Sequence, residues 1–203
     1  MLDLQAYLNR LASAEPTPGG GSAATIVGAF GAALVAMVGR LTLGNPRYEA
    51  VHADAVLLVG EADMLRARFT SARSADEAAY AAVVLAQALP RVTAAEAAAR
   101  GARLQAALIG AAQAPLEAAG LAVSLLTLCA RAASLGNPNL VSDVECAVAF
   151  GHAALEASAA NVRINHRFIK DAQLVAEQAR QLAVLIDAGR SSETAARELI
   201  SPG

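Results

Sequence analysis

Apolar side chains recur at steps of three and four along two stretches of this 203-residue chain. The first stretch is Val51, Ala55, Leu58, Ala62, Leu65 and Phe69, and the second is Phe168, Ala172, Val175, Ala179, Leu182 and Ile186. Such steps return to one face of an α-helix, and charged residues such as Glu61 and Glu177 lie off that face. Each stretch therefore predicts a helix with one buried seam. No run alternates apolar and polar residues over the length of a strand.

Residues that start and stop helices divide the rest of the chain. We expect a short helix over residues 2–13, a turn through the prolines and glycines of 16–21, and a long helix over residues 22–43 with Ser22 as its N-cap. Leu-Gly-Asn-Pro occurs at 43–46 and again at 135–138. In both copies Gly is expected as a left-handed terminator, Asn as a cap and Pro at the first helical position.

Three Ser/Thr-x-x-Glu patterns predict capping boxes, at Ser74, Thr93 and Ser142. Pro115 lies inside the helical pattern of residues 93–135 and predicts a kink or break there. The chain is thus expected to form one all-α domain over residues 1–203, a bundle of long antiparallel helices.

Composition sets limits on this bundle and its partners. Hydrophobic residues make up 56% of the chain but aromatic residues only 3%, so the core must consist of Ala, Leu and Val. The net charge is −2 without a basic run, which argues against a nucleic-acid partner. Because so few large side chains are available to bury apolar area, we expect a homodimer packed through long helices.

A mean hydropathy of +0.42 raises the possibility of a membrane protein. The longest uncharged run, residues 23–39, has 17 residues, mostly Ala and Gly, and a spanning helix needs about 20 apolar residues. We therefore expect a buried core helix and no membrane partner. Residues 1–10 lack the apolar segment of a signal peptide, so a cytoplasmic location is expected.

The spacing of the cysteines and histidines does not match that of metal ligands. Cys129 and Cys146 lie in apolar helical segments and are expected as small buried thiols without a disulfide. His52, His152 and His166 fall on separate segments without the spacing of paired ligands. No metal site is expected.

The stretch Pro16-Thr-Pro-Gly-Gly-Gly-Ser22 precedes the predicted long helix. Pro fixes φ and Gly frees it, so Gly19, Gly20, Gly21 and Ser22 would present bare backbone N–H groups at a helix N-terminus. Such groups suit an anionic or carbonyl oxygen of a ligand. The alternative is a purely structural turn, in which the glycines let two helices approach closely.

Asp76 is the leading candidate for chemistry. It is expected in the first turn of a helix capped by Ser74, and Tyr80 and Gln87 return to within about 40° of it on one face. A carboxylate, a phenol and an amide on one face form a plausible acid–base and orienting set. Asp76 could equally be a partner of the helix dipole, as could Asp143 after the Ser142 cap.

Four blocks of sequence resemble the cyclodeaminase/cyclohydrolase family, which includes the second domain of formiminotransferase-cyclodeaminase and stand-alone bacterial folate enzymes. The blocks are residues 16–24 with 28–34 and 37–42, residues 75–80 with Leu89-Pro90, residues 136–139 with 142–144, and residues 161–165. They follow the family's order and span nearly the whole chain. One departure is Arg91, where the family usually has Lys after the Leu-Pro pair.

The resemblance implies folate one-carbon chemistry. Either 5-formiminotetrahydrofolate closes to 5,10-methenyltetrahydrofolate with loss of ammonia, or the methenyl compound is hydrolysed to 10-formyltetrahydrofolate. The family's catalytic carboxylate falls in the block containing Asp76. The family also implies a homodimer with the folate cleft near the subunit boundary, and no cofactor beyond the tetrahydrofolate substrate.

Other polar positions are substrate-binding candidates under this resemblance. Asn161 and Asn165 are one helical turn apart, as are Arg163 and Arg167, and the two pairs could hold a pterin edge and a glutamate carboxylate. They could instead form a solvated helix face. The sequence leaves open which of the two reactions is catalysed, and a non-catalytic bundle that binds folate or a protein remains the alternative.

Overall fold

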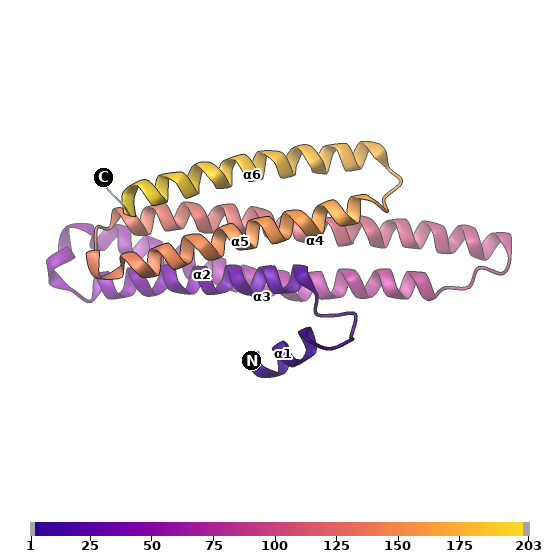
Figure 1. Cartoon of the computed structure of the whole chain (residues 1–203), viewed down its shortest axis with the longest axis horizontal. Helices are drawn as coiled ribbons and strands as arrows, with labels where there is room; N and C mark the ends of the chain where they lie inside the picture. The colour runs from indigo at the N-terminus through magenta and orange to yellow at the C-terminus, as the bar shows by residue number, and fades with distance from the viewer. Residues whose placement is uncertain (1–2, 201–203) are drawn as a thin grey trace.

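The computed structural model describes residues 3–200, and every regular element in that range is helical (Figure 1). The long helices lie side by side and successive ones run in opposite directions, which confirms the predicted all-α antiparallel bundle. The α-helices are α1 (Leu4–Leu11), α2 (Gly20–Leu43), α3 (His52–Ala88), α4 (Ala94–Ser134), α5 (Val141–His166) and α6 (Ala172–Ile200). Two short 3₁₀ helices, η1 (Pro46–Val51) and η2 (Pro138–Leu140), precede α3 and α5.

The core lies between α2, α3, α4 and α5, and α6 covers the outer side of α4 and α5. Its members are mostly Ala, Leu and Val, as the composition requires. The paired ends of α3 and α4 extend beyond the other helices as a hairpin (Figure 1). A smaller cluster of Val83, Leu108, Ala111, Ala112 and Ile169 packs at the base of this hairpin.

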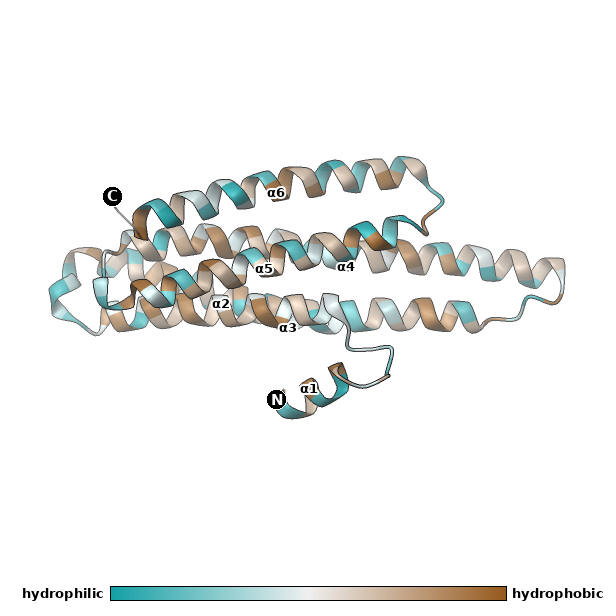
Figure 2. Ribbon diagram, in the orientation of Figure 1, coloured by the Kyte–Doolittle hydropathy of each residue, from teal (hydrophilic) through white to brown (hydrophobic). Residues whose placement is uncertain are grey.

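The predicted seam of α3 is confirmed. Ala55, Leu58, Ala62, Leu65 and Phe69 are all buried, and no charged residue lies on this seam. Figure 2 shows hydrophobic and hydrophilic residues interspersed along the helices. Phe69 meets α2 at Gly28, where an added Cβ would lie 2.4 Å from the ring carbon Cε1. A glycine at this position therefore lets a large aromatic ring fit between two closely spaced helices.

The seam predicted for the last helix is wrong in its first half. Phe168 lies before α6 and is exposed, as are Ala172 and Ala179. The buried stripe of α6 instead includes Gln178, Leu182, Ile186, Gly189 and Ala196. Sequence periodicity missed this stripe because its buried members include a glutamine and a glycine.

Helix α2 and helix α4 are each long and apolar enough to cross a membrane by length and composition. About half of each apolar window is buried inside the bundle, 50% for α2 and 56% for α4. Core helices of soluble proteins have the same character, and the buried face of α2 agrees with the core helix expected for residues 23–39. The absence of a membrane partner stays a prediction.

Two of the three predicted capping boxes are wrong. Ser74 lies in the middle of α3, which runs without interruption for 37 residues, so Asp76 is not in a first turn. Ser142 follows Leu140, the N-cap of α5. The same pattern fails in mid-helix because the backbone N–H groups there already have intrahelical partners. At Thr93 the box is present: its hydroxyl accepts from Glu96 N at 3.2 Å, and the Glu96 carboxylate accepts from Thr93 N at 2.8 Å.

The two Leu-Gly-Asn-Pro turns differ. Gly136 has the expected left-handed φ of 68°, but Gly44 has φ −72° and is right-handed. Asn45 and Asn137 do act as caps, accepting from the backbone N–H two residues on. Pro115 does not break α4, which continues from Ala94 to Ser134.

The two cysteines have different environments. Cys129 is fully buried, and burial raises the pKa of its thiol to about 12. Cys146 is exposed, so the expectation of a buried thiol is wrong there: its position on α5 faces away from the neighbouring helices. Both are free, as predicted.

The contact between Gly28 and Phe69 makes a testable prediction. Gly28→Ala should lower the free energy of unfolding by about 1–3 kcal/mol, because the new methyl group meets a ring that is fully buried and has no space to move. Gly60→Ala on α3 is the control, since a Cβ there meets nothing within 4 Å and should stabilise the helix by about 0.5–1 kcal/mol. Urea unfolding of both variants measures the difference, and equal stability of the two would contradict the packing argument.

Candidate functional site

The chain enters α2 through a turn that α1 holds in place. Arg10 of α1 donates from Nη2 to the carbonyl oxygen of Thr17 at 3.2 Å. Tyr7, the one buried residue of α1, places its hydroxyl 3.0 Å from Ser22 Oγ. These contacts fix the position of the glycines at the start of α2.

Helix α2 begins at Gly20, with Gly19 as its N-cap. The prediction that Ser22 is the N-cap is wrong, because the glycines themselves adopt the first helical turn. Gly19 has no side chain to cap the helix, and the first backbone bond within it runs from Ala23 N to Gly19 O at 3.0 Å. The N–H groups of residues 20–22 therefore have no partner within the helix.

The carboxylate of Asp76, from α3, lies against this helix start. It accepts a hydrogen bond from the Ser22 backbone. An added Cβ at Gly21 would lie 2.2 Å from Asp76 Oδ1 and 2.8 Å from Oδ2. Only glycine at position 21 thus allows the carboxylate to approach the bare N–H groups of α2.

A second set of polar groups lies beneath the Asp76 contact. Ser22 Oγ donates to Glu77 Oε1 at 2.9 Å, and Arg73 Nη1 donates to the same oxygen at 2.7 Å. Since a carboxylate only accepts, the Ser22 hydroxyl gives its proton to Glu77 and accepts from Tyr7. The chain Tyr7–Ser22–Glu77–Arg73 ties α1, α2 and α3 together at this point.

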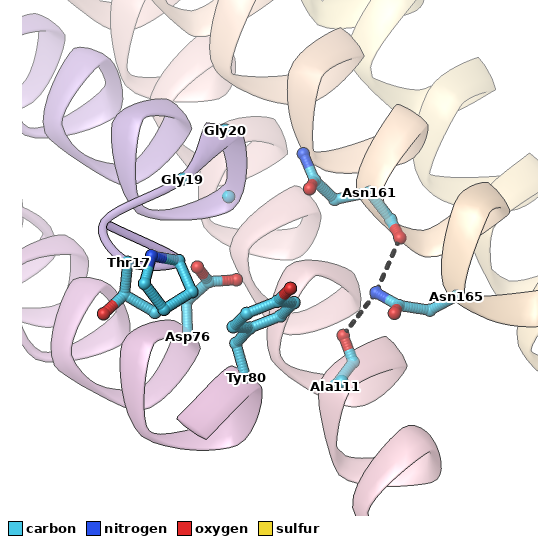
Figure 3. Close-up of a pocket in the computed structure, with 10 residues that line it drawn as sticks. Thr17, Gly19, Gly20, Asp76, Tyr80, Ala111, Asn161 and Asn165 are labelled. Carbon is cyan, nitrogen blue, oxygen red and sulfur yellow. Dashed lines mark hydrogen bonds between the residues drawn. The ribbon is translucent and has the colours of Figure 1, made fainter. Parts of the chain in front are cut away.

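A cavity of about 210 Å³ opens beside Asp76 (Figure 3). Asp76 and Tyr80 come from α3 on one side, and Asn161 and Asn165 come from α5 on the opposite side. Residues of the turn and α4 complete the lining: Pro16, Thr17, Gly19, Gly20, Gly21 and Ala111. Elements distant in sequence therefore converge on one polar cavity.

A second cavity of about 360 Å³ shares Tyr80 and Asn165 with the first, so the two adjoin. Its other lining residues are Val83, Gln87, Leu104, Gln105, Leu108 and Phe168. Together the two cavities form an extended site with a polar end at Asp76 and a more apolar end between α3 and α4.

The amide of Asn165 has a defined orientation. Its Nδ2 donates to Ala111 O at 2.8 Å and to Asn161 O at 2.9 Å. Both N–H groups are thereby occupied, and Oδ1 is left as an acceptor. Asn161 Nδ2 donates once, to Ala157 O at 2.8 Å, which leaves it one further N–H and Oδ1.

Burial raises the pKa of the Asp76 carboxyl above its ordinary value. The hydrogen bond from the Ser22 backbone opposes this shift, and the negative charge of Glu77 reinforces it. A raised pKa makes a carboxylate a stronger base when ionised, so Asp76 is suited to accept and return a proton.

Most of the predicted site residues meet in this region. Gly19, Gly20, Gly21, Asp76, Tyr80, Asn161 and Asn165 line the first cavity, and Gln87 lines the second. Ser22 is buried behind the first cavity and holds the α2 start.

The structure separates Asp143 and Arg163 from both cavities. Asp143 is 18 residues before Asn161 on α5, or about 27 Å along the helix at 1.5 Å per residue. Arg163 is exposed and lies about 200° around α5 from Asn161. Arg91 lies in the exposed connection between α3 and α4 and lines neither cavity.

Several lining residues had no signal in the sequence. Ala111, Leu104 and Leu108 look like ordinary residues of a helix, and only the tertiary packing places them here. Phe168 was expected on a helix seam, but it lies in the connection between α5 and α6. Among residues 3–200, no three His, Cys, Asp or Glu side chains gather where they could hold a metal ion.

The raised pKa of Asp76 predicts a pH dependence of stability. Between the unfolded-state pKa of 3.8 and the higher folded-state pKa, the folded protein binds more protons, so stability falls as pH rises through this window. The Asp76→Asn variant has no carboxyl to ionise, so it does not lose this stability as pH rises. It should therefore be more stable than the unmodified protein at neutral pH and equally stable at pH values below both pKa values.

Asp63→Asn is a control for which the change in stability at neutral pH should have the opposite sign. The hydrogen bond from Arg40 is the main cause that holds the pKa of Asp63 below its ordinary value, so this carboxylate stabilises the fold above the unfolded pKa. Urea unfolding across pH 3–8 should give the Asp63 variant a deficit at neutral pH. A deficit of the Asp76 variant at neutral pH would refute the assignment.

Comparisons with known proteins show the family and the fold of this chain. The chain is 38% identical over 191 residues to the methenyltetrahydrofolate cyclohydrolase of Methylorubrum extorquens, covering 94% of this chain and 92% of that protein. It is 32% identical over 168 residues to the formimidoyltransferase-cyclodeaminase of Rattus norvegicus, covering 83% of this chain but only 31% of that longer protein. The crystal structure of formiminotetrahydrofolate cyclodeaminase from Thermotoga maritima superposes with a TM-score of 0.88 at 26% identity, over 98% of this chain and 96% of that one. A model of the formiminotransferase-cyclodeaminase family matches residues 3–184, and the chain belongs to this family.

Proposed function

We propose that this protein is a folate one-carbon enzyme that hydrolyses 5,10-methenyltetrahydrofolate to 10-formyltetrahydrofolate in the cavity beside Asp76. The observation that carries the proposal is a single half-buried carboxylate with a raised pKa that faces two amides across the cavity. The similarity to the Methylorubrum cyclohydrolase over nearly the full length of both chains supports the choice of reaction.

The proposed reaction needs one group that moves a proton twice. Asp76 takes a proton from water as the water oxygen bonds to the methenyl carbon, which gives a neutral tetrahedral carbon between N5 and N10. The bond from this carbon to N5 then breaks. Protonated Asp76 gives its proton to N5, the hydroxyl loses its proton to solvent, and a formyl group remains on N10. Acid–base catalysis of this kind contributes about 10²–10⁴-fold to a rate.

The remaining cavity residues bind and orient the substrate. Asn165 offers Oδ1 and Asn161 offers both an N–H and Oδ1, which match the donor and acceptor edge of a pterin. The more apolar second cavity, with Leu104, Leu108 and Phe168, suits the aryl ring that follows the pterin. Tyr80 lies between the two parts of the site.

The proposal includes no cofactor beyond the tetrahydrofolate derivative, because each step is a proton transfer or the making or breaking of a bond to the bridging carbon. It places the protein in the cytoplasm, with no nucleic-acid or membrane partner. Asp143 and Arg163 have no part in it.

Formiminotetrahydrofolate cyclodeamination is a second candidate. The Thermotoga maritima structure, whose fold this chain shares at a TM-score of 0.88, is of a formiminotetrahydrofolate cyclodeaminase. In that reaction N10 attacks the formimino carbon, Asp76 accepts the N10 proton and returns it to the departing nitrogen, and ammonia and the methenyl compound result. The same carboxylate would serve, since both reactions pass through a tetrahedral carbon between N5 and N10.

Two absorbance assays separate these functions. The purified protein mixed with methenyltetrahydrofolate should accelerate the loss of its near-ultraviolet absorbance. Appearance of that absorbance from 5-formiminotetrahydrofolate would instead identify a cyclodeaminase. A stoichiometric spectral change without turnover in either assay would favour the non-catalytic folate-binding bundle and overturn the proposal.

Asp76→Asn tests the catalytic group. It keeps the shape of the side chain but cannot accept a proton, so turnover should fall about 10²–10⁴-fold while the variant still binds the folate substrate. Asp143→Asn is the matched control, because Asp143 lies about 27 Å along α5 from Asn161 and its loss should leave turnover unchanged. Near-normal turnover by folded Asp76→Asn would remove Asp76 from the mechanism.

We also propose a homodimer. On α3, the large apolar side chains of Leu57, Met64 and Leu85 are 59%, 62% and 71% exposed. A second copy that packs against α3 would cover them. Light scattering at micromolar concentration should report twice the mass of 20.6 kDa, and a stable monomer would contradict the proposal.

A further inference from the structure

Helix α4 contains a proline one helical turn after Ala111, which lines the first cavity. Pro115 is buried in mid-helix, and α4 continues past it in both directions. A regular helical carbonyl accepts from the N–H four residues later. Pro115 has no N–H, so the carbonyl of Ala111 lacks the partner that its position in the helix would otherwise provide.

That carbonyl lines the cavity and is taken by a side chain from another helix. Asn165 Nδ2 of α5 donates to Ala111 O at 2.8 Å (Figure 3). Its other proton goes to Asn161 O at 2.9 Å. Without an open acceptor at Ala111, one of the two Asn165 N–H groups would have to turn elsewhere.

We propose that Pro115 is a positioning residue: by freeing the Ala111 carbonyl it fixes the Asn165 amide so that Oδ1, and not Nδ2, is the group available to the substrate. An amide presents a donor and an acceptor of nearly the same shape, and rotation by half a turn exchanges them. Occupying both N–H groups with backbone acceptors on two helices leaves a single orientation. The site then accepts a substrate N–H at this point and disfavours a substrate carbonyl.

The inference rests on the proposed folate function, because it assigns Asn165 to substrate recognition. The substitution that tests it is Pro115→Ala, which restores the backbone N–H at position 115. The restored N–H would compete with Asn165 for the Ala111 carbonyl, so the amide becomes free to rotate. Because proline in a helix interior is unfavourable by about 3 kcal/mol, this variant should fold at least as well as the parent, apart from the lost packing of the ring.

A double-mutant cycle measures whether Pro115 acts through Asn165. Pro115→Ala should lower kcat/KM for methenyltetrahydrofolate about tenfold, mainly through KM, as expected when a binding group is misplaced. In an Asn165→Ala background the same change should have less than about a twofold effect, because no amide is left to orient. Equal effects in both backgrounds would show that Pro115 acts on α4 alone and would overturn the proposal.

Gly120→Ala is the matched control for a change in α4. An added Cβ at Gly120 meets nothing within 4 Å, and the substitution favours the helix without touching the Ala111 carbonyl. It should leave both kinetic constants within about twofold of the parent. A tenfold loss in this control would mean that any stiffening of α4 impairs the site, and the proposal would fail.

A measurement on the unmodified protein keeps the inference testable even if Pro115→Ala does not fold. Hydrogen exchange of side-chain amides by NMR should show both Asn165 N–H protons protected, whereas only one proton of Asn161 has a partner. Rapid exchange of both Asn165 protons would overturn the proposed orientation. These outcomes differ from failure of the folate function itself, which would appear as absence of turnover in the parent protein while the amide protons remain protected.

Discussion

The contact between the start of α2 and the Asp76 carboxylate is the constraint on which the site depends. The helix begins with two glycines after a glycine N-cap and has no side-chain cap of its own, so its first N–H groups need an acceptor from elsewhere. Asp76 of α3 provides it, and the missing Cβ of Gly21 makes the approach possible. The carboxylate thus contacts the start of a helix and also lines the first cavity. Its burial and its hydrogen bond move its pKa in opposite directions, and burial has the larger effect.

The rest of the bundle keeps this contact in place. Ser22, Glu77 and Arg73 bind α2 to α3 beside Asp76, and the seam from Ala55 to Phe69 aligns the same two helices over several turns. With few large side chains, the core achieves its packing through close approach of helices, as where Phe69 fits against Gly28. A shift of α2 along α3 would disturb both the core and the carboxylate, so packing and chemistry are coupled.

The sequence predicted the helical class, the α3 seam and the glycine turn, because each is a local pattern with a direct physical cause. It predicted a helix start at Ser74 because a capping pattern looks the same in mid-helix, and it placed the starts of α2 and α5 two or three residues too late, at Ser22 and Ser142. Asp76 was singled out for the wrong local reason: its helix N-terminus belongs to α2, more than 50 residues away in sequence. Asn165 and Ala111 are 54 residues apart, and no periodicity reports such a pairing. The polar face of Asn161 and Asn165 could be predicted, but its contact with the Ala111 carbonyl of α4 could not.

Two irregularities of helix structure meet at the cavity and explain why polar groups gather there. Gly19 leaves N–H groups of α2 without a cap, and Pro115 leaves a carbonyl of α4 without a helical donor. A buried backbone group without a partner is costly, so each must be satisfied by a side chain from a neighbouring helix. Asp76 accepts from the Ser22 backbone at the first, and Asn165 donates to the Ala111 carbonyl at the second. These backbone hydrogen bonds orient both side chains, and under the proposed function their remaining oxygen atoms would contact the substrate. Rigid orientation of functional groups follows here from the requirement that no buried backbone group be left unpaired.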